Sequence, residues 1–183
     1  MRIISMTLIA FALMNGFVES SEAAAPVTII VEAKVGDWQR TNIILTNGQE
    51  AVITVPHLEN DEPQRWGITD PKNRKPWNTY WGNGVRASKH YKKRGAYEGA
   101  LLVSLVGQEK DAVAFEERNQ KITIKGPGEI QFMANDDIHP RKIFVWEKMG
   151  YDYHNGFSDN EGSLNVVVLK TNTSTLTQPQ QLP

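Results

Sequence analysis

Oxygen-bearing side chains gather at two places in this 183-residue sequence, and each place adjoins a stretch of β-forming residues. Asn135-Asp136-Asp137 directly follows the apolar segment Ile130 to Met133, and Ser158-Asp159-Asn160-Glu161-Gly162 directly precedes the segment Ser163 to Leu169. If these segments are neighbouring strands, the two polar clusters meet at one sheet edge. Carboxylate and amide oxygens suit calcium, which takes about six to eight oxygen ligands with tolerant geometry. The same residue types are also typical of turns between strands, so spacing alone leaves both interpretations open.

Catalytic chemistries have weaker support. The absence of cysteine excludes disulfides, thiolate metal sites and cysteine nucleophiles. The stretch from Gly156 to Asn160 begins like a nucleophile elbow but lacks the closing glycine. The carboxylates of the two clusters could form the acid pair of a glycoside hydrolase, although calcium would compete for the same oxygens. Four histidines are too scattered for a zinc signature: His57, His90, His139 and His154. We expect no enzyme, with a glycan hydrolase as the weaker option.

The elements that must position these residues are short β-strands. Apolar residues alternate with polar ones, most clearly over 121–125 and 163–168, and this pattern is typical of antiparallel strands with one face in a core. Turn signals such as Asn47-Gly48 and Gly126-Pro127-Gly128 separate the strands. The pattern predicts an all-β protein, a two-sheet antiparallel β-sandwich. Its strands are expected at 27–31, 42–45, 51–55, 101–106, 121–125, 129–134 and 163–169.

Two long loops interrupt the regular spacing, and long loops often carry function. The first runs from His57 to about Glu98 and is rich in aromatic residues, with room for a short strand. It also contains a basic run: Arg86, Lys89, His90, Lys92, Lys93 and Arg94. Such a run is either a solvated loop or, with the aromatic rings between its cations, a dock for an anionic glycan. The second loop lies between Ala134 and Gly162, with acidic ends and an aromatic middle.

The two ends of the chain differ from the middle. Arg2, an apolar run from Ile3 to Met14 and the small residues that end at Ala23 are typical of a secretory signal peptide. The run of about a dozen residues is too short for a membrane span, which needs about 20. We expect a signal peptide over 1–23, a sandwich domain over 24–170 and a disordered tail over 171–183. The mature protein is then secreted or periplasmic.

The overall charge provides no reason to expect a nucleic-acid partner. Twenty basic residues stand against twenty-one acidic ones, for a net charge of −1 at pH 7. Removal of the expected signal peptide takes away Arg2, Glu19 and Glu22, which leaves equal numbers of basic and acidic residues. We therefore expect no nucleic acid as a partner, and the short apolar run at the N-terminus gives no membrane span.

Between Val27 and Lys170 the sequence resembles the small soluble calcium-dependent galactose-binding lectins of pseudomonads and the bacterial lectin-like sugar-binding domains related to them. The matching segments keep their order along the chain. They are Val31-Glu32-Ala33, Trp38, Thr41-Asn42-Ile43, Gln64-Arg65-Trp66-Gly67, Gly99-Ala100-Leu101-Leu102, Gly107, Gly128-Glu129-Ile130, Asn135-Asp136 and Asp159-Asn160-Glu161-Gly162-Ser163-Leu164. The resemblance implies a jelly-roll, galactose-binding-like sandwich with one calcium at the sheet edge. In that family, adjacent hydroxyls of the sugar complete the coordination of the ion.

Carried over position by position, the resemblance assigns the ligands of calcium. Asp136, Asp159 and Asn160 correspond to the side-chain ligands, and Asn60 and Gly156 lie near the positions of two main-chain carbonyl ligands. The chain also departs from the family. A long insertion separates Asp136 from Asp159, and the stretch that contacts galactose in the family has no match, so the identity of the sugar is not carried over.

Aromatic residues where the family pattern fails are the candidates for sugar contact. Exposed rings can stack on the apolar face of a sugar, and we expect this role for Trp77, Tyr80, Trp81 and Trp146. Trp38 and Trp66 lie on matched segments and are expected in the core. The resulting prediction is a secreted bacterial lectin or adhesin that binds glycans through calcium, with galactose-containing and anionic glycans and a homo-oligomer all left open. The alternative is a non-catalytic structural or interaction protein of the bacterial envelope with a degenerate sugar site.

Overall fold

A computed structural model describes residues 24–69, 76–137, 141–145, 150–154 and 160–172 of the chain, with 68, 69, 76, 77 and the strands between 141 and 154 described by their backbone alone. The expected signal peptide over 1–23 therefore lies outside the described residues. Among those described, no helix has the length and apolar character that a membrane span requires.

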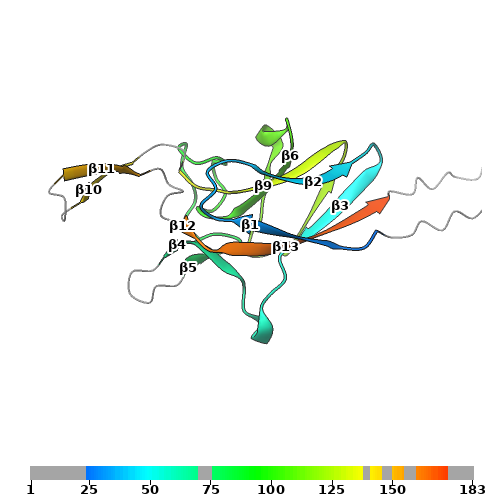
Figure 1. Ribbon diagram of the computed structural model, residues 1–183, viewed down its shortest axis with the longest axis horizontal. Coiled ribbons are helices and arrows are strands. Elements are labelled where there is room, and N and C mark those ends of the chain that lie inside the picture. The colour runs from blue at the N-terminus through cyan, green and yellow to red at the C-terminus, as the bar shows by residue number, and fades with distance from the viewer. Residues whose placement is uncertain (1–23, 70–75, 138–140, 146–149, 155–159, 173–183) are drawn as a thin grey trace, which may run out of the picture.

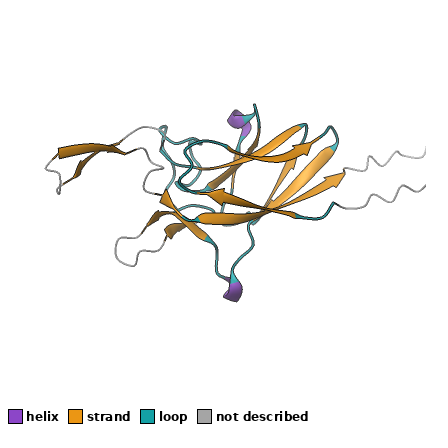
Figure 2. Cartoon of the chain, in the orientation of Figure 1, coloured by secondary structure: helices purple, strands orange, loops and turns teal. Residues whose placement is uncertain are grey.

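The described residues form an all-β fold in which two four-stranded antiparallel sheets make a sandwich (Figure 1, Figure 2). The first, here called the β13 sheet, contains in spatial order β1 (Val27–Glu32), β13 (Ser163–Asn172), β3 (Gln49–Thr54) and β8 (Lys121–Lys125). The second, the β9 sheet, contains β2 (Gln39–Leu45), β9 (Gly128–Ala134), β6 (Leu101–Leu105) and β7 (Val113–Ala114). All seven strands expected from the sequence are present, and the prediction of a two-sheet antiparallel sandwich is confirmed.

The hydrophobic core lies between the two sheets. Strand β8 alternates between exposed and buried residues, so that Ile122 and Ile124 point into the core. Strand β13 does the same with Leu164, Val166 and Val168. From the opposite sheet, side chains of β6 and β9 enter the same cluster. Because the pleat of a strand directs successive residues to opposite faces, this alternation holds each strand in register with its core face inward.

The β9 sheet is buried on both faces near β6. All five residues of β6 are buried, which breaks the alternation seen in β8 and β13. On the outer face, Leu102 packs in a second cluster with Ala96, Ala100 and Ala114. Ala96 belongs to the first long loop, and Tyr97 of the same loop packs against this cluster, so the loop folds back over the outer face of the β9 sheet. The part of this loop over residues 83–98, here called the covering loop, carries the basic run.

Further strands lie within the two long loops. The first loop contains β4 (Arg65–Thr69) and β5 (Pro76–Thr79), which form a small sheet with β12 (Asn160–Glu161) in the order β12-β4-β5. The second loop contains a separate hairpin of β10 (Arg141–Val145) and β11 (Gly150–His154).

Two short 3-10 turns complete the described structure, η1 (Glu59–Asp61) and η2 (Glu109–Asp111). The prediction that the tail begins at residue 171 is wrong by two residues. Thr171 and Asn172 continue β13 and pair with Glu50 and Gln49 of β3. The remainder of the expected tail, 173–183, lies outside the described residues.

Candidate functional site

The structure brings Asp136 and Asn160 into direct contact. Asn160 Nδ2 donates a hydrogen bond of 2.6 Å to Asp136 Oδ2. The condition under which the sequence predicted this convergence is not met, because β9 and β13 belong to opposite sheets and are not neighbours. Asn160 instead lies on β12, which pairs with β4 at the end of the sandwich where β9 also terminates. The two polar clusters meet through this third sheet.

Both side chains are removed from solvent. Asp136 is 8% exposed and Asn160 is 4% exposed. Asp136 Oδ1 accepts a hydrogen bond of 2.7 Å from the backbone N–H of Asp137, and Asn160 Nδ2 also lies 3.4 Å from the carbonyl oxygen of Ala33. Ala33 is held in place because its N–H donates to the carbonyl of Gly162, two residues beyond Asn160. The pair is therefore anchored to the backbone of three separate segments, at residues 33, 136–137 and 160–162.

One oxygen of this pair lacks a partner. Asn160 Oδ1 is fully buried, and within the described part of the chain no hydrogen-bond donor reaches it. A buried polar atom left unsatisfied costs about 1–3 kcal/mol, and in folded proteins nearly all such atoms are satisfied by protein groups, water or ions. The other polar atom of the same amide, Asn160 Nδ2, contacts the carboxylate of Asp136. A cation would satisfy the unpartnered Oδ1.

The donor set at this position fits a hard cation. A carboxylate and an amide carbonyl are both oxygen ligands that calcium accepts. The described residues contain no group of three histidine, aspartate or glutamate side chains that could hold a metal ion, so the two side chains contribute only part of a coordination shell. Asp159 and Gly156, which the resemblance also assigns as ligands, lie outside the described residues.

The segment that carries Asp136 is positioned by Gly99. The N–H of Gly99 donates to the carbonyl of Asn135 at 2.7 Å, and the N–H of Asn135 donates to the carbonyl of Ala100 at 2.8 Å. The carbonyl of Gly99 accepts a hydrogen bond of 2.9 Å from the indole of Trp66. Gly99 has a φ of +71°, and an added Cβ would overlap the side chain of Asn78. Glycine is required here because any side chain would push the chain away from β5.

The side chain of Asn135, which the sequence analysis named only as a member of the first polar cluster, holds the covering loop in place. Asn135 is fully buried, and its Oδ1 accepts a hydrogen bond of 2.8 Å from the N–H of Lys93. Its Nδ2 donates to the carbonyls of Lys93 at 3.1 Å and Tyr97 at 2.9 Å. The covering loop is thereby tied to the residue immediately before Asp136. The one signal in the sequence was the position of an asparagine at the end of a buried strand.

Asn60 stands apart from the pair. It lies in η1, on the loop between β3 and β4, is exposed, and has a φ of +70°. The turn η1, the lower helical turn in Figure 2, projects away from the body of the sandwich, whereas β12 lies at its end (Figure 1). The described structure therefore joins two of the five residues that the resemblance assigned to calcium, Asp136 and Asn160.

The aromatic candidates divide into three groups. Tyr80 is 1% exposed and packs edge-on against Trp81 and Phe115, so the expectation of an exposed sugar-stacking ring is wrong for this residue. Tyr80 is buried because its ring fills the core beside β6. Trp81 is half-buried, with its side chain packed against the core. Trp146 and the side chain of Trp77 lie outside the described residues. Trp66 is fully buried and Trp38 is partly buried against the core, as expected.

A histidine pairs with the buried tyrosine. His57 Nδ1 lies 2.8 Å from Asp61 Oδ1, and His57 Nε2 lies 3.3 Å from the hydroxyl of Tyr80. Burial raises the pKa of the Tyr80 hydroxyl above its ordinary value, so this group stays protonated at neutral pH. These contacts attach the loop that carries η1 to the core.

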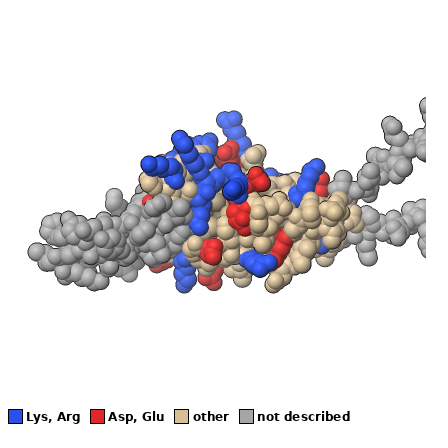
Figure 3. Space-filling view, turned by 90° about the horizontal axis from the view of Figure 1, so that it is seen from above, with Lys and Arg blue, Asp and Glu red and all other residues tan. Residues whose placement is uncertain are grey.

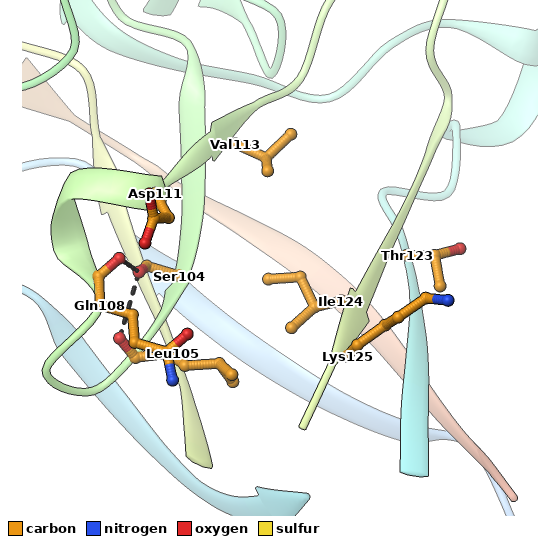
Figure 4. A pocket seen from close by; sticks show the side chains of 8 residues that line it. All are labelled: Ser104, Leu105, Gln108, Asp111, Val113, Thr123, Ile124 and Lys125. Atoms are coloured by element: carbon orange, nitrogen blue, oxygen red, sulfur yellow. Dashed lines mark hydrogen bonds between the residues drawn. The ribbon is translucent and has the colours of Figure 1, made fainter. Parts of the chain in front are cut away.

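A groove of about 190 Å³ lies elsewhere, between β6, η2 and β8 (Figure 4). Ser104 Oγ donates to the carbonyl of Gln108 at 2.7 Å, and Lys125 pairs with Glu50 at 3.0 Å, so these polar groups already have partners. None of the residues predicted from the sequence to bind metal or sugar lines this groove.

Comparison of the chain with protein-family models and with curated proteins finds no match.

Proposed function

We propose that this protein binds carbohydrate through a calcium ion held by Asp136 and Asn160, and that it does so as a secreted, non-catalytic lectin. The observation that carries the proposal is the buried Asp136–Asn160 pair with its unsatisfied Oδ1. A turn that only connects strands has no need of a buried carboxylate beside an amide oxygen without a donor. The resemblance to calcium-dependent bacterial lectins falls on the same two residues.

Asp136 and Asn160 would contribute differently to binding the ion. Asp136 supplies the negative charge that attracts a hard cation, and Asn160 supplies a neutral oxygen that its backbone segment holds in place. Calcium, when bound, offers coordination positions that adjacent hydroxyls of a sugar can fill. Asp159 precedes Asn160 directly in the sequence and would add a second carboxylate. Trp81, which is half-buried, would offer its ring to the C–H face of a sugar.

Calcium should stabilise the folded protein. A ligand that binds only the native state stabilises it by RT ln(1 + [L]/Kd), which is about 2.7 kcal/mol at 100 times Kd. For a domain of this size, that corresponds to a rise in melting temperature of about 5–10 °C. Thermal unfolding in a calcium series and in chelator measures this shift. A melting temperature that is the same in both conditions would contradict the proposal and leave the envelope-protein alternative.

The variant Asp136→Asn tests the position of the ion. Asparagine keeps the shape and one oxygen of the side chain but removes its charge, and a tenfold loss of calcium affinity reduces the stabilisation by about 1.4 kcal/mol. Asp111→Asn is the matched control, because Asp111 is exposed on η2 and contacts neither residue of the pair. The control should keep the full response to calcium. An equal response in both variants would move the ion away from Asp136.

Sugar binding requires a separate measurement. A glycan array probed with and without chelator should show binding that chelator removes, and the Asp136→Asn protein should lose binding to every glycan. Binding that survives chelator unchanged would show that the ion is structural and that the sugar site lies elsewhere.

A further inference from the structure

The tip of the covering loop presents cations beside the candidate calcium site. Residues 83–98 form an irregular hairpin in which the N–H of Ala87 donates to the carbonyl of Ala96 at 2.8 Å and the N–H of Gly95 donates to the carbonyl of Ala87 at 3.0 Å. Its tip spans residues 88–95 and contains most of the basic run. Figure 3 shows Lys and Arg side chains gathered on the face of the molecule that is seen from above.

The cations of this hairpin do not all play the same part. Arg86 stabilises the loop itself, because its guanidinium lies 4.0 Å from the centroid of the Tyr97 ring, donates to the carbonyl of Gly95 at 2.7 Å and pairs with Glu116 at 3.2 Å. His90 also has a contact within the protein. Four cations remain, here called the basic tip: Lys89, Lys92, Lys93 and Arg94. Over the described residues, none of these four side chains has an ion-pair or hydrogen-bond partner.

The basic tip is held next to Asp136. Tyr91 pairs with Asp137 in an isolated antiparallel bridge, and the Asn135 side chain fixes both the N–H and the carbonyl of Lys93. Bridge partners have Cα atoms about 4.5–5.5 Å apart and consecutive Cα atoms lie about 3.8 Å apart. The Cα of Tyr91 therefore lies within about 9 Å of the Cα of Asp136. One short oligosaccharide can reach both the basic tip and the candidate calcium site.

Four cations without partners repel one another, and a folded protein retains such a cluster at a cost in stability. The backbone that carries the cluster is held at Lys93, since the Asn135 side chain hydrogen-bonds both the N–H and the carbonyl of that residue. A group of cations on a backbone held in this way fits an anion. The neighbouring site selects among anions, because calcium accepts carboxylate oxygens readily.

From this placement we propose that the protein's ligand is an acidic saccharide of the uronic-acid class, whose carboxylates contact the basic tip while its hydroxyl or carboxylate oxygens reach the calcium site. This inference rests on the proposed function and deepens it. It requires that binding of the acidic saccharide and of calcium reinforce each other, since thermodynamic linkage makes the effect reciprocal.

The test uses the full mature chain and three soluble probes. Trigalacturonic acid carries the carboxylates, galactotriose has the same ring without them, and a sulfated trisaccharide matches the charge with sulfate esters. Calorimetric titration in calcium should show the tightest binding for trigalacturonic acid, a weaker affinity for galactotriose, and loss of both in chelator. Trigalacturonic acid should also raise the affinity of the protein for calcium, by the same factor by which calcium raises the affinity of the protein for trigalacturonic acid.

Substitutions at the basic tip should separate the acidic from the neutral ligand. An exposed ion pair is worth a factor of about 1.5 to 5 in affinity, so Lys92→Gln with Lys93→Gln should weaken trigalacturonic acid by about 2- to 25-fold and leave galactotriose and calcium unchanged. The matched control is Lys110→Gln with Lys121→Gln, since both lysines are exposed and lie outside this hairpin. The control should bind all three probes like the wild-type protein.

Several results would overturn the inference. Equal affinity for trigalacturonic acid and galactotriose, with calcium binding and chelator sensitivity intact, would reject the acidic class while the proposed function stands. Equal or tighter binding of the sulfated trisaccharide would reject the carboxylate. Tight binding of a single-stranded oligonucleotide in chelator would assign the basic tip to nucleic acid. The proposed function itself is judged separately, by the calcium titration without any saccharide.

Discussion

At the scale of single residues, the contact between Asp136 and Asn160 defines the candidate site. Each side chain alone has an ordinary structural explanation, since aspartate and asparagine are common at strand ends. Their burial together, with one amide oxygen unsatisfied, is what distinguishes them from turn residues. The same scale explains why Tyr80 cannot stack on a sugar, because its ring is enclosed by Trp81 and Phe115.

The variant Asn160→Asp should depend on calcium for its stability. The substitution replaces the hydrogen bond from Nδ2 to Asp136 with two carboxylates in contact, and loss of a hydrogen bond to a charged group costs about 1.5–3 kcal/mol. In chelator the variant should therefore unfold more easily than the wild-type protein. Calcium should restore much of this loss because the new carboxylate is itself a calcium ligand.

Denaturant unfolding in calcium and in chelator measures the stability of this variant, with Asn160→Ala as the comparison. Alanine removes the same hydrogen bond and supplies no oxygen, so it should be destabilised in both conditions. If Asn160→Asp were destabilised equally in calcium and chelator, the pair would be a structural contact only.

At the scale of elements, the pairing of β2 with β9 is irregular, and the carboxylate of Glu129 stabilises the irregular part. The register between the strands shifts between Arg40 and Ile44, and Asn42 has a φ of +60°. Glu129 on β9 accepts a hydrogen bond of 2.9 Å from the N–H of Asn42 and pairs with Arg40. These contacts, that of Asn42 first, lower the pKa of Glu129 below its ordinary value.

Glu129→Gln should reduce stability at neutral pH and lose this effect in acid. Because the folded-state pKa of Glu129 is depressed, its ionised form contributes stability that is present above its ordinary pKa and is lost as pH falls through the folded value. The difference in unfolding free energy between wild type and variant should therefore shrink with decreasing pH. Denaturant unfolding across this acid range measures it. Glu117→Gln, at an exposed position, is the control. If the difference in unfolding free energy between wild type and Glu129→Gln stayed constant with pH, the stabilising role of ionised Glu129 would be contradicted.

The end of β13 provides a second prediction at this scale. Thr171 and Asn172 extend the pairing with β3, and Gln49 Nε2 donates to Asn172 Oδ1 at 3.2 Å. Truncation after Lys170 removes these contacts and should cost about 1–2 kcal/mol, at about 0.5–1.5 kcal/mol for each hydrogen bond. Truncation after Asn172 retains them and should leave the unfolding free energy unchanged. Urea unfolding of the two shortened proteins distinguishes them, and equal stabilities would show that the last two pairs contribute nothing.

At the scale of the whole molecule, the two sheets bring together segments that are distant in the sequence. Ala33, Asp136 and Asn160 meet because β1, β9 and β12 end on the same side of the sandwich, and the covering loop reaches that side through Asn135. The basic tip and the candidate calcium site thus lie at the same end of the sandwich. The outer face of the β9 sheet supports the covering loop and so holds the basic tip beside the candidate calcium site.

The export of the protein is also a property of the whole chain. The pattern from Arg2 to Ala23 predicts cleavage after Ala23, because Ser21 and Ala23 then occupy the two small-residue positions of the cleavage site. N-terminal sequencing of the exported protein should read Ala24 first. An intact Met1 on protein that stays in the cytoplasm would contradict the secreted location and weaken the proposal of a lectin.

The sequence by itself determined the strands and the two polar clusters. A strand that is exposed on one face leaves a period-two pattern that can be read directly, and this pattern located β8 over its full length and most of β13. The other expected strands were located from apolar runs between turn residues, and β7 was not predicted. The pattern does not mark the ends of the strands, as Thr171 and Asn172 show, because cross-strand pairing rather than hydrophobicity decides where β13 stops.

Only the tertiary structure decided which polar residues meet. Asp136 and Asn160 are 24 residues apart and touch through a two-stranded pairing of β12 with β4 that has too few residues to leave a pattern. The burial of Tyr80 and the attachment of the basic tip to Asn135 are likewise decided by packing between segments. The physical reason is that burial and hydrogen-bond partners belong to pairs of distant residues, whereas a sequence pattern reports only on neighbours along the chain.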